Sequence, residues 1–135
     1  MNTKQVIYWG ARILAAIIMV QTLYFKFTAS PESVYIFSTL GMEPWGRIGT
    51  GVLELVASVL ILIPSLVWLG SVLAFGLMVG AIGMHATLLG IEVKGDGGQL
   101  FVYALIVAIC GVYSFWHSRS TIPATIKGFL PLFLQ

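Results

Sequence analysis

Residues 49–64 read "GTGVLELVASVLILIP", an apolar run that contains one carboxylate, Glu54. Runs of this kind are typical of membrane-spanning helices, which need about 20 predominantly apolar residues. A charged side chain in the middle of such a helix costs about 2.5–3.5 kcal/mol on insertion scales, so it persists where it has a partner or a function. Glu54 is therefore the starting point for both the fold and the candidate site.

The composition of the whole chain is that of an integral membrane protein. Of its 135 residues, 59% are hydrophobic and 9% are charged, and the mean hydropathy is +0.98. Soluble domains carry about 25% charged residues. Leu55–Ile91 contains no Asp, Glu, Lys or Arg, which is too long for one span and fits a hairpin of two. The net charge of +2 is too small to indicate a nucleic-acid partner.

The sequence predicts a single domain over residues 1–135, an all-α bundle of four transmembrane helices. The predicted spans are Val6–Phe27, Arg47–Leu66, Ser71–Gly90 and Gln99–His117, with a turn at Pro64–Gly70 and a loop at Val93–Gly98. The first span has the position of a signal peptide, but Arg12 would interrupt the apolar part of such a peptide. We therefore expect a retained helix.

A short interfacial helix is predicted between the first two spans. Ser30 is a typical N-cap, Pro31 a typical first helical residue and Glu32 a favourable first-turn acid. Gly41 would end the helix. Its apolar face would consist of Val34, Phe37 and Leu40, which places the segment at the membrane interface or across the end of the bundle.

Lysines and arginines indicate an orientation. With four spans, both termini lie on one side of the membrane. That side carries Lys4, Arg12, Arg119 and Lys127, and the other side carries Lys26, Arg47 and Lys94. Because cytoplasmic segments hold the excess of basic residues, we expect both termini in the cytoplasm.

Polar side chains of the four spans converge at one depth. Counting from the span ends at about 1.5 Å per residue puts Lys26, Glu54, His85 and Tyr103 in the same leaflet, with Gln99 just above Tyr103. This convergence has two interpretations. Glu54 is either structural, as an ion pair with Lys26 or a protonated acid bonded to His85 or Tyr103, or it binds a ligand or handles protons.

Helical periodicity indicates which faces turn inward. On the first span, Lys26 shares a face with Arg12, whereas Gln21 points away and is left out of the site. Glu54 is flanked by small residues that mark a helix contact. The inward stripe of the last span is predicted to be Gln99, Tyr103, Ile106, Cys110, Tyr113 and His117.

The third span presents two opposed faces. Gly76, Gly80 and Gly83 form a ridge of small residues, and His85 lies roughly opposite. If His85 faces the bundle, the ridge faces lipid and is a candidate surface for a homodimer or a partner helix. If the ridge packs inside, His85 meets lipid. We favour the first arrangement, because ionisable residues within membranes face the bundle interior.

A second polar layer is expected near the opposite end of the bundle, from Arg12, Tyr113 and His117. His85 and His117 lie near opposite ends and Cys110 is remote from His85, so no metal site is predicted. No Ser, His and Asp fall at one depth, so nucleophilic catalysis is not indicated. Whether the chain is an enzyme stays open.

These features resemble the DoxX-like family of small four-helix membrane proteins. The resemblance rests on Arg12 in "ARILAAII", Lys26 in "LYFKF", "LGMEP" at residues 40–44, Glu54 in "GVLELVASVLIL" and His85 in "GMHATLLG". Family members often have a glycine where this chain has Tyr24, two residues before the lysine.

The resemblance implies a shared fold and two classes of function. DoxX relatives are associated with thiosulfate:quinone oxidoreduction and with membrane complexes that handle oxidative stress. They imply a redox-associated subunit that binds a quinone or other lipid through Lys26, Glu54, His85 and Tyr103, with electrons exchanged by a membrane redox partner. Eukaryotic relatives act as assembly chaperones for ligand-gated channels, which implies a non-catalytic interaction protein with a structural Glu54 cluster.

Overall fold

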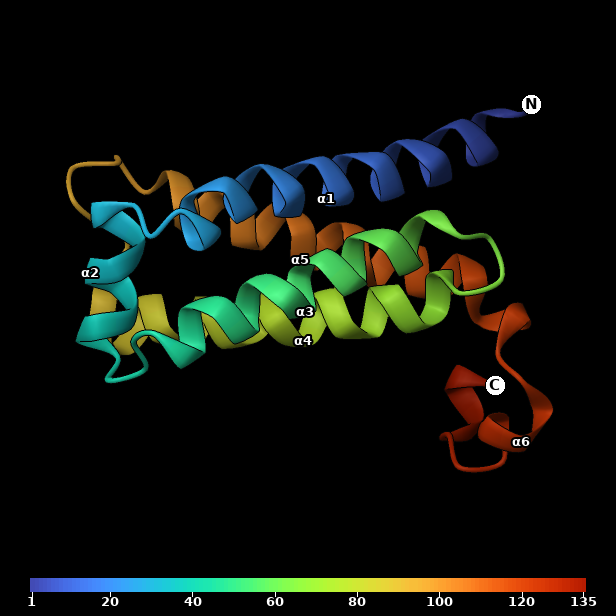
Figure 1. Cartoon of the computed structure of the whole chain (residues 1–135). Helices are drawn as coiled ribbons and strands as arrows, with labels where there is room; N and C mark the ends of the chain where they lie inside the picture. Colours follow the sequence, from blue (N-terminus) through green and yellow to red (C-terminus); the bar gives the residue numbers. More distant parts are fainter.

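The computed structural model describes all residues 1–135 and is helical throughout, without strands. Four long helices form an antiparallel bundle (Figure 1): α1 (Thr3–Phe27), α3 (Trp45–Leu62), α4 (Val67–Met84), continued by the π-helical turn η1 (His85–Leu89), and α5 (Gln99–Ser118). Helix α2 (Pro31–Thr39) crosses the end of the bundle between α1 and α3. The predicted all-α bundle of four helices, with a short helix after the first, is confirmed.

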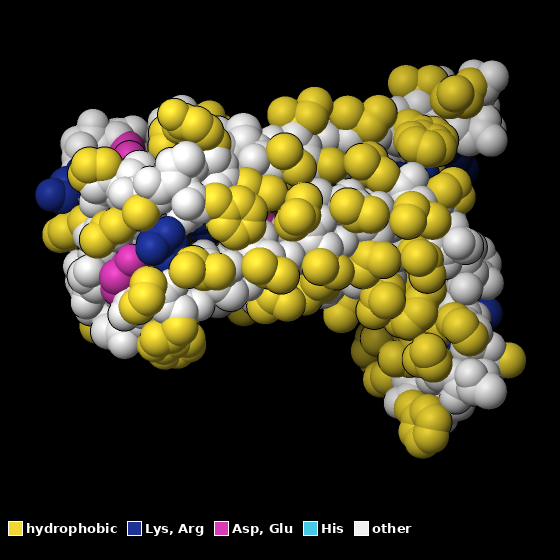
Figure 2. Space-filling view, in the orientation of Figure 1, with side chains coloured by type: hydrophobic (Ala, Val, Ile, Leu, Met, Phe, Trp, Pro, Cys, Tyr) yellow, Lys and Arg dark blue, Asp and Glu magenta, His cyan; other side chains and the backbone are white.

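The outside of the bundle is that of a multi-pass membrane protein. Each of the four long helices is long and apolar enough to cross a membrane. Helix α1 packs beside α3 and α5, and α4 also packs beside α3 and α5, so every long helix keeps one side for lipid. Hydrophobic side chains cover the length of the bundle in Figure 2, and most of the charged side chains visible there lie towards its ends.

Side-chain caps fix the starts of the first two helices. Asn2 Oδ1 accepts a hydrogen bond from the Gln5 N–H at 2.9 Å, and the Gln5 side chain accepts one from the Asn2 N–H at 3.0 Å. These reciprocal bonds form a capping box before α1. Ser30 caps α2 as predicted, because its hydroxyl accepts a hydrogen bond from the Ser33 N–H at 3.3 Å. Local sequence thus sets both helix starts.

The turn between α3 and α4 is shorter than predicted. The sequence predicts a turn over Pro64–Gly70, whereas α4 already begins at Val67. Gly70 lies inside α4 and is buried against α3, where a Cβ would be 2.8 Å from the Leu60 carbonyl carbon and 2.9 Å from Ile61 Cα. Glycine is needed here because two helix backbones approach closely, not because the chain turns.

Gly70→Ala is expected to lower the free energy of unfolding by about 1–3 kcal/mol, because the added methyl group overlaps backbone atoms of α3. Gly49→Ala on α3 is the matched control, since a Cβ there meets no atom within 4 Å and alanine favours a helix. Reversible unfolding in mixed micelles measures both variants. Equal stability of the two would contradict the close contact at Gly70.

The buried face of α5 differs from the predicted stripe. The buried residues are Ala104, Val107, Ala108, Cys110, Gly111, Ser114 and Ser118, whereas Tyr103, Ile106 and Tyr113 are half-buried and Gln99 and His117 are exposed. A Cβ on Gly111 would lie 3.3 Å from the Ser71 carbonyl oxygen, so the small residues of α5 pack directly against α4. The larger side chains with polar ends therefore lie along the edge of the buried face.

Two buried arginines join α1 and α3 at opposite ends of this helix pair. Arg12, only 1% exposed, donates from Nε to the Ile61 carbonyl oxygen at 2.7 Å and from Nη2 to the Leu62 carbonyl oxygen at 2.8 Å. Arg47, in the first turn of α3, donates to the Lys26 carbonyl oxygen near the end of α1. Carbonyls at a helix C-terminus lack partners within the helix and carry its negative dipole end, so each arginine supplies both a donor and a positive charge.

The residues after α5 lie beside the bundle at the end opposite α2 (Figure 1). They form the short turns η2 (Arg119–Thr121), α6 (Ala124–Lys127) and η3 (Leu132–Leu134). Ile122 is buried, whereas Phe129 and Phe133 are exposed. This segment is therefore attached to the bundle through Ile122 and adds little to its core.

Candidate functional site

A cavity of about 470 Å³ lies between the four long helices at the α2 end of the bundle. This volume is in the range of pockets that hold small molecules, about 300–1,000 Å³. Its lining includes all the residues predicted for the site from the sequence: Lys26, Glu54, His85, Gln99 and Tyr103. Most of the other lining residues are apolar, so the cavity has a mainly hydrophobic lining with a small number of polar groups.

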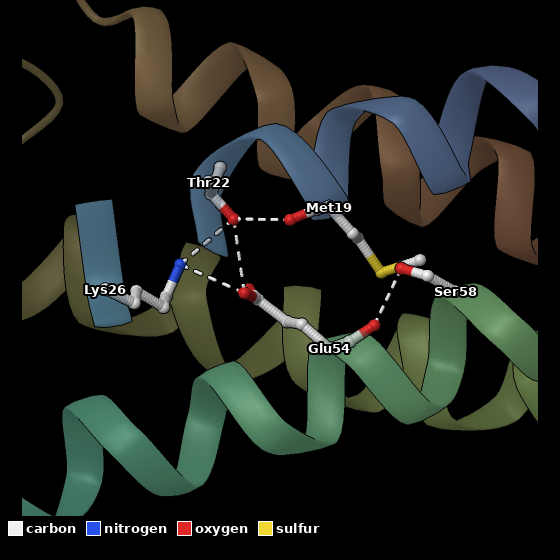
Figure 3. Close-up of polar contacts among 5 residues, drawn as sticks. All are labelled: Met19, Thr22, Lys26, Glu54 and Ser58. Carbon is white, nitrogen blue, oxygen red and sulfur yellow. Dashed lines mark hydrogen bonds and ion pairs between the residues drawn. The ribbon is translucent and has the colours of Figure 1, made fainter. Parts of the chain in front are cut away.

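Lys26 and Glu54 form an ion pair across the contact between α1 and α3 (Figure 3). Lys26 Nζ lies 3.0 Å from Glu54 Oε2, and the two side chains are 14% and 6% exposed. The Thr22 hydroxyl joins the pair, 3.2 Å from both Lys26 Nζ and Glu54 Oε2, and it also lies 2.7 Å from the Met19 carbonyl oxygen. Thr22 is not among the residues predicted for the site, although its spacing of four residues from Lys26 places both on one helix face.

The contacts of Glu54 separate the two structural interpretations of this residue. The ion pair with Lys26 is present, and no hydrogen bond joins Glu54 to His85 or Tyr103. All side-chain contacts of Glu54 use Oε2, so Oε1 has no hydrogen-bond partner in the protein. Lys26 also keeps a free N–H, because it donates one hydrogen bond to Thr22 and the ion pair with Glu54 can occupy at most one more of its three N–H groups.

His85 is 5% exposed and begins the π-helical turn η1. Its Nδ1 lies 2.8 Å from the Gly90 carbonyl oxygen. Because a carbonyl only accepts, Nδ1 carries the proton and Nε2 of the neutral ring is an acceptor. No group of the protein bonds to Nε2. Turns of the π type are rare in proteins, and those that occur are often found at functional sites. The unused acceptor of His85 therefore lies at the cavity wall in a segment whose backbone is typical of such sites.

Tyr103 and Gln99 form a second polar pair on the cavity wall. Gln99 Nε2 donates to the Tyr103 hydroxyl oxygen at 2.8 Å. The hydroxyl therefore acts as an acceptor towards Gln99 and keeps its own proton for another partner. Tyr103 thus adds a free donor from α5 to the same cavity wall that holds the free acceptor of His85 at the start of η1.

Asp96 holds the loop between η1 and α5 in shape. Its Oδ1 accepts hydrogen bonds from the N–H groups of Val93 at 2.9 Å and Gly98 at 2.8 Å, and its Oδ2 accepts one from Leu100 at 3.3 Å. Burial by itself would raise the pKa of Asp96, but the three donors and the positive charge that His85 can carry outweigh it, so the pKa is lowered. The contribution of these Asp96 hydrogen bonds to the stability of the fold is present above the ordinary pKa of aspartate. It is lost as the pH falls through the lowered pKa.

The family is settled by a comparison with known proteins. The DoxX-like family model matches residues 11–112, which is most of the chain. The chain belongs to the DoxX-like family. No curated protein and no solved structure matches it. The matched segment contains every cavity residue predicted from the sequence, from Lys26 to Tyr103, whereas Tyr113 and His117 lie outside it.

The second polar layer of this DoxX-like protein lies at the other end of the bundle, away from the cavity. The Arg12 guanidinium carbon is 5.0 Å from the centre of the Tyr8 ring, and the Tyr8 ring is 5.9 Å from the His117 ring. His117 in turn stacks on Tyr113 at 4.1 Å. The structure therefore brings the three predicted residues together through Tyr8. The sequence does not single out Tyr8, because tyrosines near a span end also fit an interfacial belt.

Gln21 and two of the ridge glycines also reach the cavity. Gln21 is exposed, in keeping with its predicted outward direction, yet it borders the cavity, because the cavity extends past the inward face of α1 that periodicity identifies. Gly76 and Gly80 line the cavity as well, whereas Gly83 does not. His85 is buried and all three glycines are exposed, the arrangement favoured from the sequence. A role of the ridge as a partner surface stays a prediction.

Proposed function

We propose that this DoxX-like protein is a redox-associated membrane subunit that binds a lipophilic ligand of the quinone class in the cavity. The observation that carries the proposal is the distribution of unused hydrogen-bonding groups. Lys26 and Glu54 offer a free N–H and a free oxygen at the contact of α1 with α3. Tyr103 and His85 offer a free O–H and a free ring nitrogen at the contact of α5 with α4.

Two donor–acceptor pairs fit both redox states of such a ligand. A quinone carries two carbonyl oxygens, which would accept from Lys26 and Tyr103. The corresponding quinol carries two hydroxyl groups, which would donate to Glu54 and His85. A site with only donors or only acceptors would favour one state, whereas this one serves a subunit that has to bind both.

The charge of the cavity also favours a neutral head group. Lys26 and Glu54 are 3.0 Å apart and together contribute no net charge. The lining holds one further charged residue, the acid Glu32 at the start of α2. An anionic ligand would therefore lose its hydration on entering and gain no unpaired positive charge, which is unfavourable in a membrane interior. In this proposal the electrons are exchanged with a membrane redox partner. The termini lie in the cytoplasm, as the basic residues favour, so the cavity lies in the opposite leaflet.

Tyr103→Phe is expected to weaken binding of ubiquinone-2 about fivefold, because the variant keeps the ring and loses one hydrogen-bond donor, worth about 1 kcal/mol. Tyr113→Phe is the matched control: it removes the same hydroxyl from the same helix, at the end of α5 remote from the cavity. Native mass spectrometry of protein titrated with ubiquinone-2 measures both. Wild-type protein that retains no quinone, or an equal loss in both variants, would contradict the proposal.

The second candidate function is a non-catalytic interaction or assembly protein. It is favoured by the completeness of the Lys26–Glu54 pair, whose charges already satisfy each other within the protein. In that case the polar cluster fixes the positions of α1 and α3, and the exposed glycines of α4 bind a partner helix or a second copy. The same titration separates the two functions, because the interaction protein would show no saturable quinone binding.

A further inference from the structure

Helices α3 and α4 are tightly packed at one end and leave open space at the other. Near their turn, Gly70 of α4 touches the α3 backbone at Leu60 and Ile61. Two and three turns further along α4, a Cβ on Gly76 or Gly80 would meet no atom within 4 Å. Both glycines are exposed on the outside of the bundle, yet both line the cavity.

We infer that the gap between α3 and α4, bordered by Thr50, Gly76 and Gly80, is a lateral opening through which the hydrocarbon tail of the cavity ligand extends into the membrane. Thr50 on α3 is half-buried and lines the same cavity as the two glycines. This inference rests on the proposed function and names its ligand more closely: a neutral quinone head with one long apolar chain.

The volume of the cavity and the position of its polar groups both fit such an opening. A volume of about 470 Å³ suits a molecule of drug size, so a long polyprenyl or alkyl chain has to continue outside. The polar end of the ligand has a place inside, because the buried His85 lines the cavity with an unpaired Nε2. The hydrocarbon chain of the ligand would leave the cavity between two lipid-facing helices, where it is surrounded by lipid tails as apolar as itself. Glycines leave room for it there, because they have no side chain.

A contact surface for another helix is the usual reason for a ridge of small residues in a membrane, and Gly83 separates that explanation from ours. Gly83 belongs to the same ridge, is exposed and has no atom within 4 Å of a Cβ, but it does not line the cavity. A contact surface would involve Gly83 together with Gly80. An opening would involve Gly76 and Gly80 alone.

The test compares Gly80→Leu with Gly83→Leu, using tailless ubiquinone-0 and decylubiquinone as probes in native mass spectrometry and binding titrations. We expect Gly80→Leu to weaken binding of decylubiquinone at least tenfold and to weaken binding of ubiquinone-0 much less. Gly83→Leu should bind both as the wild type does. Ubiquinone-0 binding by Gly80→Leu also shows that the variant is folded with an intact polar site.

Each other result overturns the inference in a recognisable way. Unchanged decylubiquinone binding in Gly80→Leu would refute the lateral opening and leave the quinone site standing. Equal effects of the two leucines, with a change in oligomer mass, would assign the ridge to a second copy or a partner. Failure of the wild type to bind either quinone would refute the proposed function and the opening together.

Discussion

Arg12→Met is expected to lower the free energy of unfolding by about 3 kcal/mol. The methionine chain fills much of the same space, but the carbonyl oxygens of Ile61 and Leu62 lose their donors at 2.7 and 2.8 Å. An unsatisfied buried acceptor costs about 1–3 kcal/mol, and the favourable charge at the C-terminus of α3 is lost as well. Contacts of the guanidinium with the Trp9 ring, 3.8 Å from its centre, disappear too.

Unfolding by sodium dodecyl sulfate in mixed micelles measures this loss. Arg12→Lys should fall between the wild type and Arg12→Met, because an ammonium keeps the charge but lacks the planar fork that reaches both carbonyls. Lys4→Met is the control for removal of a cation from the same helix, since Lys4 is exposed. If Arg12→Met unfolds at the same detergent fraction as Lys4→Met, the buried arginine does not stabilise the end of α3.

Glu54→Leu is expected to lower the free energy of unfolding by about 3 kcal/mol, because it leaves the Lys26 ammonium without its counter-ion inside the bundle. Removing one partner of a buried ion pair costs about 3–5 kcal/mol, and the 14% exposure of the Lys26 side chain favours the lower end of that range. The double variant with Lys26→Met should recover most of the loss, since two apolar side chains suit the surrounding membrane helices.

A double-mutant cycle by the same unfolding method isolates the coupling between the two side chains. Glu92→Leu provides the control, because Glu92 is an exposed acid in the loop after η1. Strictly additive effects of Glu54→Leu and Lys26→Met would mean that the pair contributes nothing to stability. Glu54 would then be present for its ligand alone.

Depth in the membrane was predictable from sequence, because antiparallel spans of known length place residues by simple counting. Lys26, Glu54, His85 and Tyr103 gather at one cavity for that reason. Their individual bonds were not predictable. Glu54 could reach Lys26, His85 or Tyr103 at the same depth, and the choice depends on the rotation of four helices about their own axes.

Helical periodicity did not predict correctly how each helix is rotated about its own axis. On α5 the polar-tipped residues suggested the inward face, but close packing of Gly111 against α4 turned that face to the edge of the core. The hydrogen bond from Arg12 to the Ile61 carbonyl oxygen was also not predictable, because Ile61 lies on another helix, 49 residues further along the chain. Thr22 was missed for a different reason: a threonine in a membrane helix commonly bonds its own backbone, and only the position of Glu54 shows that this one does more.

The two arginine contacts have a consequence for how the chain can vary in length. Fourteen residues separate Arg12 from Lys26 in α1, and fourteen separate Arg47 from Ile61 in α3, about 21 Å of helix in each case. A residue inserted into one of these stretches would rotate its arginine about 100° away from the carbonyls unless the other helix gained one too. Insertions and deletions in α1 and α3 should therefore be tolerated only as matched pairs, whereas α4 and α5 are free of this constraint.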